Sequence, residues 1–66
     1  MSLEETIART NPPEDRDEVL RQFHEANEGK PDGHVEAMVE MICTGAVVIY
    51  LDAERILTIK APHLTN

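Results

Sequence analysis

The sequence has few of the residues that usually stabilise a very small protein. Its 66 residues include one cysteine, no tryptophan, one tyrosine and one phenylalanine. Cys43 cannot form an internal disulfide, and a single unpaired thiol is typical of a reducing compartment. Chains of this size bury little surface and usually need a disulfide, a metal or a partner chain for stability. We therefore expect one small domain over 1–66, in which 1–12 is a flexible or packing N-terminal arm.

Long apolar runs and positive charge are also scarce. The longest stretch without a charged residue, 41–51, is much shorter than the ~20 residues that cross a bilayer. The N-terminus lacks the basic and apolar regions of a signal peptide. Six Lys and Arg against 13 Asp and Glu give a net charge of −7, the wrong sign for binding nucleic-acid phosphates. We expect a cytoplasmic protein, the cytoplasm of an infected host included, that binds neither membranes nor nucleic acid directly.

Capping residues divide the first part of the chain into short helices. Ser2 and Glu5 have the S-x-x-E spacing of a capping box, which predicts a helix over 3–9. Asn11, as an N-cap, and the two prolines after it predict the start of a second helix over 13–28. Gly29, which follows, is a typical residue at a helix end.

The third element, 34–44, is compatible with a helix and with a strand. Its apolar residues occur at helical spacing and also alternate as in a strand, but its Glu, Ala and Met content favours a helix. As a helix it is apolar on more than one side and should be covered by more than one neighbour.

The last part of the chain predicts a β-hairpin. Two β-branched segments, 46–51 and 56–61, flank a polar turn, and turns of two or four residues both place Leu51 opposite Ile56. On this register both faces of the hairpin are largely apolar. We expect the face with Val48 and Tyr50 to pack on the chain's own helices. The opposite face should join a second copy, because a two-stranded ribbon cannot leave large aliphatic side chains in water. Its residues are Val47, Ile49, Leu51 and Ile56.

The fold class predicted by these patterns is α+β: two or three short helices followed by a C-terminal antiparallel β-hairpin, assembled as an oligomer. The negative charge lies in the helical part, because 1–45 has 11 acids and 4 bases (a net of −7) and 46–66 has two of each. A solvated surface explains this charge, and so does a surface that binds a basic region of another protein. The candidate partner-binding residues are Glu14, Asp17, Glu18, Glu25 and Glu28.

Two other functions are compatible with the sequence. Arginines outnumber lysines four to two, which suits planar recognition of carboxylate or phosphate in a small-molecule site between subunits. The candidate residues for it are Arg9, Arg16, Arg21, Arg55 and His24. The other function is a metal-dependent enzyme at the subunit interface, with zinc favoured by ligands such as His24, Glu28, His34 and His63.

The residues favour binding over catalysis. The sequence has no glycine-rich phosphate loop and no pattern that pairs Cys43 with a histidine base, so we assign no catalytic residue, metal or cofactor. We expect a small acidic oligomeric protein that acts as an adaptor or inhibitor of a partner protein, as accessory regulators and phage-encoded inhibitors do.

Overall fold

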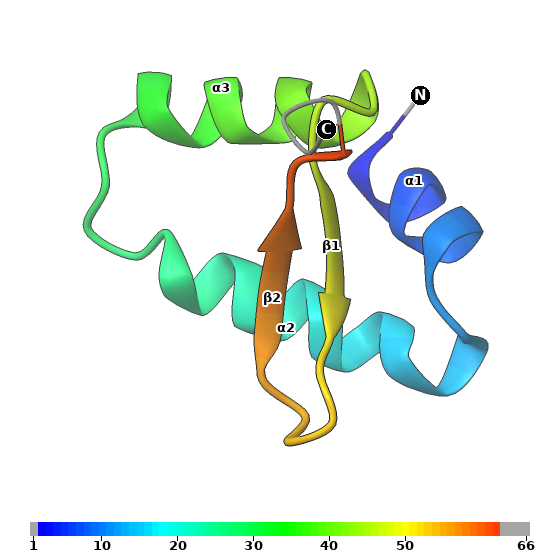
Figure 1. The fold of residues 1–66 in the computed structure, drawn as a ribbon. Helices are drawn as coiled ribbons and strands as arrows, with labels where there is room; N and C mark the ends of the chain where they lie inside the picture. The colour runs from blue at the N-terminus through cyan, green and yellow to red at the C-terminus, as the bar shows by residue number, and fades with distance from the viewer. Residues whose placement is uncertain (1, 63–66) are drawn as a thin grey trace.

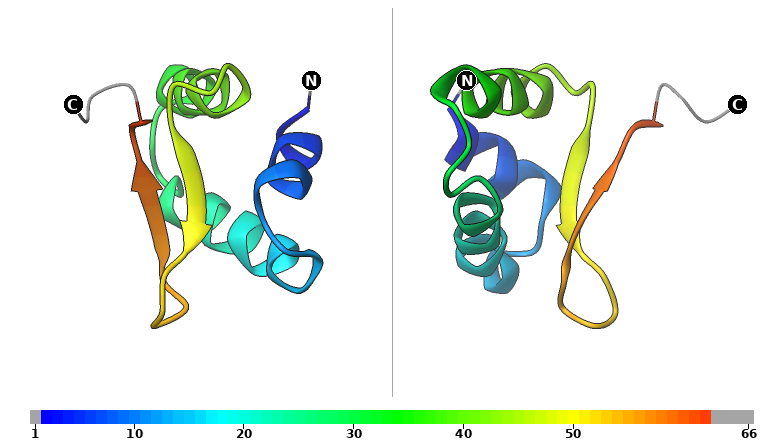
Figure 2. Two further views of the ribbon diagram at one scale, coloured as in Figure 1. Left: turned by 45° about the vertical axis from the view of Figure 1, so that its right-hand side comes forward. Right: turned by 90° about the vertical axis from the view of Figure 1, so that its left-hand side faces the viewer.

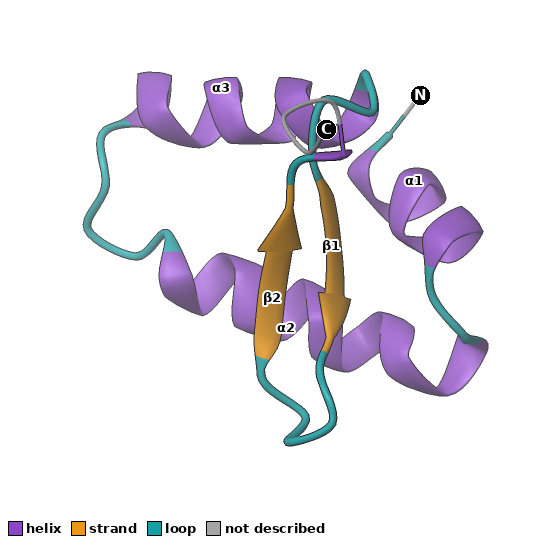
Figure 3. Ribbon diagram, viewed as in Figure 1, coloured by secondary structure: helices purple, strands orange, loops and turns teal. Residues whose placement is uncertain are grey.

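A computed structural model describes residues 2–62 and confirms the predicted order of helices followed by a hairpin (Figures 1 and 3). None of the helices in this range is long and apolar enough to cross a bilayer. The elements are α1 (Leu3–Thr10), the 3₁₀ turn η1 (Pro13–Asp15), α2 (Arg16–Ala26), α3 (Asp32–Cys43), β1 (Val48–Leu51) and β2 (Leu57–Lys60).

The molecule has two layers, the three helices on one side and the hairpin on the other (Figure 2). Side chains from every helix and from the β1 segment meet between the layers, so the core joins both ends of the chain. The buried hydrophobic residues are Leu3, Ile7, Val19, Phe23, Ile42, Val47 and Ile49.

The predicted capping box begins α1. The Glu5 amide donates to Ser2 Oγ at 3.2 Å, and the Ser2 amide donates to Glu5 Oε1 at 3.3 Å. The hydrogen bonds from the Ser2 side chain and backbone lower the pKa of the Glu5 carboxyl. The glycines after α2 and α3 have the left-handed conformation typical of helix ends, with φ of 78° at Gly29 and 83° at Gly45.

Asn11 differs from its prediction as the N-cap of the second helix. It lies at the C-terminal end of α1 and is buried. Its Nδ2 donates to the carbonyl oxygen of Ile7 at 3.2 Å and to that of Ile49 at 3.1 Å. The two prolines after it set the next turn without a side-chain cap. Asn11 therefore joins α1 to β1.

The third element is a helix, not a strand. Its apolar side chains are less covered by neighbouring elements than their distribution around the helix predicted. Ile42 is its one buried residue, with Met38 and Val39 partly buried against the core. Met41 is 41 % exposed. Here α3 packs mainly on α1, so part of its apolar surface faces solvent.

The hairpin forms one residue out of the predicted register, because Leu51 pairs with Leu57 and not with Ile56. The cause is a three-residue loop, 53–55. The Arg55 amide donates to the Asp52 carbonyl at 2.9 Å, and Arg55 itself has a φ of 64°. Asp52 Oδ1 accepts from the amides of Glu54 at 2.8 Å and Ile56 at 3.0 Å, so one carboxylate organises the turn.

This shift overturns the predicted faces, since a one-residue slip moves one strand's side chains to the other side. The cross-strand pairs Ile49–Ile59 and Leu51–Leu57 share the side that faces the helices. Val47 is 6 % and Ile49 1 % exposed. Val47 and Ile49, predicted to join a second copy together with Leu51 and Ile56, are instead covered by the chain's own helices. Leu51 also packs on this core, and Ile56 is 54 % exposed.

The outer side of the hairpin is correspondingly more polar than predicted. Val48 and Tyr50, predicted to face the helices, share the opposite side with their partners Lys60 and Thr58. The true register thus gives one apolar and one mixed face. The two apolar faces that predicted a second copy were a product of the wrong register.

Candidate functional site

One candidate site is the acidic surface of α2, which we define as Glu14, Asp17, Glu18, Glu25 and Glu28. Asp17, Glu18 and Glu25 share one side of α2, Glu14 lies on η1, and Glu28 lies in the turn after α2. Four are exposed and Glu18 is half-buried. The predicted acids therefore follow one another along η1, α2 and the turn after α2, a run that we call the strip.

Arg21 lies within this strip and forms ion pairs along it. Its guanidinium lies 2.7 Å from Glu18 Oε2 and 2.8 Å from Glu25 Oε2. The hydrogen bonds and charge of Glu18, and to a smaller extent Glu25, raise the pKa of Arg21. Glu14, Asp17 and Glu28 take no part in these pairs, so the charge available to a partner comes mainly from them.

Glu18 also connects the strip to the hairpin. Its hydrogen bonds from Arg21 and Gln22 lower its pKa from 4.5 to about 2. Gln22 Nε2 donates to Glu18 at 2.7 Å and to the Arg55 carbonyl at 2.9 Å, while Gln22 Oε1 accepts from the Leu57 amide at 2.8 Å. The acidic surface is thereby fixed to the start of β2.

The residues predicted for a small-molecule site do not come together. Arg21 is within the acidic surface, Arg55 pairs with Asp15 at 2.6 Å at the hairpin tip, and Arg16 lines a shallow cavity with Glu4 and Asp17. The pairing with Asp15 raises the pKa of Arg55.

The remaining two predicted ligand residues also lie apart. His24 is exposed on α2, where its ring packs edge-to-face on Phe23 at 5.8 Å between ring centroids. Arg9 lies in a different place, on α1.

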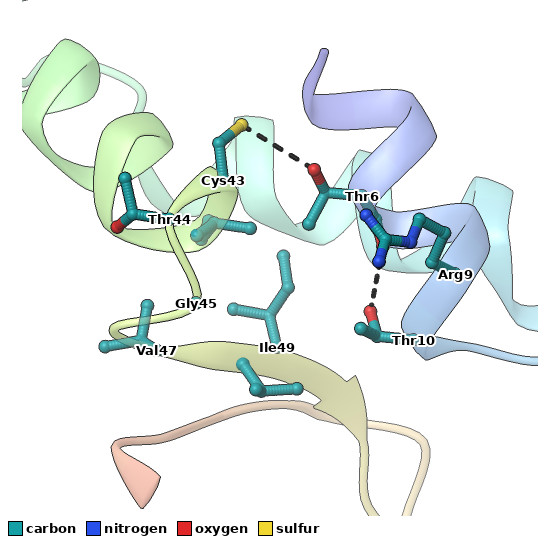
Figure 4. A pocket seen from close by; sticks show the side chains of 10 residues that line it. Thr6, Arg9, Thr10, Cys43, Thr44, Gly45, Val47 and Ile49 are labelled. Atoms are coloured by element: carbon teal, nitrogen blue, oxygen red, sulfur yellow. Dashed lines mark hydrogen bonds between the residues drawn. The ribbon is translucent and has the colours of Figure 1, made fainter. Parts of the chain in front are cut away.

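Arg9 belongs to a second candidate site, the α1–β1 pocket, with a volume of about 240 Å³ (Figure 4). The pocket lies between α1, the end of α3 and the start of β1. Arg9 is its one charged lining residue, and its guanidinium extends beside Thr10 on the α1 side. The other lining residues are Thr6, Thr10, Ile42, Cys43, Thr44, Gly45, Val47, Val48 and Ile49.

The three threonines of this pocket direct their hydroxyl protons to the backbone. Thr6 Oγ1 donates to the Ser2 carbonyl at 2.9 Å, and Thr10 Oγ1 donates to the Thr6 carbonyl at 3.1 Å. Thr44 Oγ1 donates to the Met41 carbonyl at 3.3 Å. Thr10 Oγ1 also accepts a hydrogen bond from Asn11 Nδ2 at 3.1 Å.

Cys43, for which the sequence shows no histidine base, is half-buried and lines the pocket. Its Sγ lies 3.7 Å from Thr6 Oγ1.

The candidate metal ligands lie on different elements. His24 is on α2 and His34 is on α3, both exposed, and His63 lies outside the described residues. Among residues 2–62 no group of three or more His, Cys, Asp or Glu side chains is arranged to hold a metal ion.

Sequence reasoning missed the contribution of the threonines and of two side-chain amides. Thr6 and Thr10 are four residues apart, a spacing that places both beside Arg9 on α1 and could have signalled a polar site. No comparable sequence signal shows that Asn11 and Gln22 reach the hairpin. No family model, curated protein or solved structure matches this chain, so its function has to be inferred from its own residues.

Proposed function

We propose that this protein acts by binding another protein, as a small acidic adaptor or inhibitor, and not by catalysis. The acidic surface of α2 is its contact region, and the partner carries a basic surface. Accessory regulators and phage-encoded inhibitors of host systems are examples of such proteins, and the cytoplasm is the proposed compartment.

The observation that carries this proposal is the exposure of Glu14 on η1, Asp17 on α2 and Glu28 in the turn after α2. Charges held on a rigid element attract an oppositely charged partner and raise the rate of encounter. The Arg21 ion pairs and the Gln22 contact fix the middle of the strip, so little side-chain freedom is lost there on binding.

Self-association remains part of the proposal, through Ile56 of the predicted residues and through side chains that the sequence did not predict. The large hydrophobic side chains exposed among residues 2–62 are Met41, Ile56 and Ile59. Two of them belong to the second half of the hairpin, which is where we propose that a second copy binds.

Affinity capture from host lysate with matched charge variants tests the main contact. The variant Glu14→Gln/Asp17→Asn/Glu28→Gln removes three charges from the acidic surface of α2. The control Glu36→Gln/Glu40→Gln/Glu54→Gln removes three exposed charges elsewhere. We expect a partner that wild type and control capture equally, that the α2 variant loses, and that dissociates as salt is raised. Equal capture by all three proteins would contradict the proposal.

A further inference from the structure

The hydrogen-bond pattern of the hairpin decides which backbone groups of β2 point away from β1. The Asp52 amide donates to the Ile56 carbonyl at 3.0 Å, so this pair is bonded across the two strands. Bonded and non-bonded pairs alternate in an antiparallel ladder, so the amide and carbonyl of Ile59, three residues later, point outward. The Ile49 carbonyl, opposite Ile59, also points outward, since it accepts from Asn11.

The outward groups of β2 are partly occupied. Gln22 Oε1 accepts from the Leu57 amide at 2.8 Å, but no group of the described chain bonds to the outward amide or carbonyl of Ile59. Figures 1 and 2 show no described helix or strand beside β2 on the side away from β1. The Ile59 side chain is also 51 % exposed. Another strand can therefore pair with β2 at Ile59 without displacing Gln22.

The helical layer is wider than the sheet that it supports. In Figure 1, α2, α3 and the loop between them extend past β2 on its free side. Figure 2 shows that they lie in the layer behind the hairpin, so a strand added beside β2 would lie over them. α3 also has uncovered apolar side chains, since Met41 is 41 % exposed and Met38 and Val39 are partly buried. Alternate apolar residues of an added strand would face this layer.

Charge indicates which kind of strand binds there. Glu25 and Glu28 follow Gln22 in the direction in which α2 extends past β2, and both are exposed. Basic side chains on an added strand are attracted to these carboxylates, and acidic ones are repelled. A second copy carries a net charge of −7 itself, so it is the weaker competitor for this edge.

We propose that a partner protein binds by adding an extended segment with alternating basic and apolar residues to the free edge of β2. The segment exchanges backbone hydrogen bonds with Ile59, and its apolar side chains pack on the helical layer. This inference rests on the proposed function, in which the partner is a basic protein, and specifies how that partner binds. A folded basic surface that binds α2 by charge alone would satisfy the proposed function without strand addition.

Titration of ¹⁵N-labelled protein with synthetic peptides tests strand addition. The probe has five lysines alternating with four valines, and its isomer has the five lysines first and the four valines after them. At saturation the alternating peptide should slow exchange of the Ile59 amide by about tenfold or more, whereas the isomer should shift amides of α2 and leave this exchange unchanged.

Three outcomes would overturn the proposal. Equal effects of the two peptides, or shifts confined to α2 with both, would leave binding by charge and remove strand addition. No change at Ile59 up to about 1 mM of the alternating peptide would also remove it. Protection of the Ile59 amide that rises with protein concentration, without peptide, would assign the edge to a second copy.

Matched variants identify the contacts. Ile59→Pro removes the outward donor but no hydrogen bond of the hairpin, and should weaken binding of the alternating peptide by about tenfold or more. Ile59→Val should bind it as wild type does. Glu25→Gln/Glu28→Gln should weaken binding, whereas Glu14→Gln/Asp17→Asn, with two charges removed from the other end of the strip, should not. Undiminished binding by Ile59→Pro, in a protein whose spectrum shows it folded, would overturn the assignment.

Discussion

The two strands of the hairpin differ sharply in their surroundings, although each carries an isoleucine at the same cross-strand position. Ile49 of β1 is 1 % exposed, and Ile59, directly opposite on β2, is 51 % exposed. β1 lies against α1 and α2, whereas β2 is in contact chiefly with α2. Burial in this small fold is therefore set by the neighbours of a strand and not by its residue types. Apolar packing holds β1, and polar contacts of Gln22 and Arg55 contribute much of what holds β2.

The largest difference between the strands should appear when each isoleucine is shortened. Ile49→Ala should lower the free energy of unfolding by about 2–5 kcal/mol, because it leaves a cavity in the core. Ile59→Ala should lower it by less than about 1 kcal/mol, as exposed positions do. Urea denaturation measures both values, and similar losses for the two variants would mean that the strands are equally packed.

Removing the side-chain amide that binds β1 should also cost more unfolding free energy than removing the one that binds β2. Asn11→Ala removes the donor to two carbonyl groups at a buried position and should cost about 1–3 kcal/mol of unfolding free energy. Gln22→Ala should cost about 0.5–1.5 kcal/mol, because water replaces its partners at a half-buried site.

Hydrogen exchange gives a second readout for these amides. In Gln22→Ala the amide of Leu57 should exchange faster, while amides in β1 keep their protection. Loss of protection along both strands would indicate that Gln22 supports the whole hairpin.

Lowering the pH should weaken the contacts of β2 with α2 before it weakens the contacts of β1. The pKa of Glu18 is lowered from 4.5 to about 2 by Arg21 and Gln22, so its contribution to stability is complete above pH 4.5. That contribution is lost as the pH falls from 4.5 towards 2 and Glu18 becomes protonated. Chemical shifts of the Arg55 and Leu57 amides should follow this titration, and Glu18→Gln should remove it. An unchanged titration in Glu18→Gln would assign it to another carboxyl group.

The smallest effect on stability is expected for a charge placed on the exposed part of β2. Ile59→Asp should leave the fold intact, because half of this side chain is already in water. It should shift sedimentation equilibrium towards the monomer if a second copy binds there. Ile49→Asp should instead unfold the chain. Identical sedimentation of wild type and Ile59→Asp would remove Ile59 from any proposed interface.

The sequence predicts the elements of this fold far better than their contacts. Helix ends depend on local residues, so Ser2, Glu5, Gly29 and Gly45 mark them correctly. The hairpin register depends on Arg55 adopting a conformation that favours glycine, and no local pattern reveals it. The conformation of this one residue explains why the β1 side chains face the opposite way from the prediction and why the hairpin lacks a second apolar face.

The two candidate sites also differ in how far the sequence predicts them. The acidic surface of α2 is visible in the sequence, because its five residues lie within 15 consecutive positions, 14–28. The α1–β1 pocket combines Arg9 with residues more than 30 positions later in the chain, such as Cys43 and Val47, so only the packing of α1 on the hairpin assembles it. The sequence positions of the four arginines predicted for a ligand site likewise do not show that Arg21 pairs with Glu18 and Glu25 and that Arg55 pairs with Asp15.

The amides of Asn11 and Gln22 have a further consequence for the behaviour of this chain at high concentration. Each occupies backbone groups on the outward edge of one strand: the Ile49 carbonyl on β1, and the Arg55 carbonyl and Leu57 amide beside β2. An added strand would have to displace these side chains before it could pair along the ribbon. These side chains of the helical layer therefore hinder the addition of strands during fibril growth, to which a short ribbon rich in Val and Ile is otherwise prone.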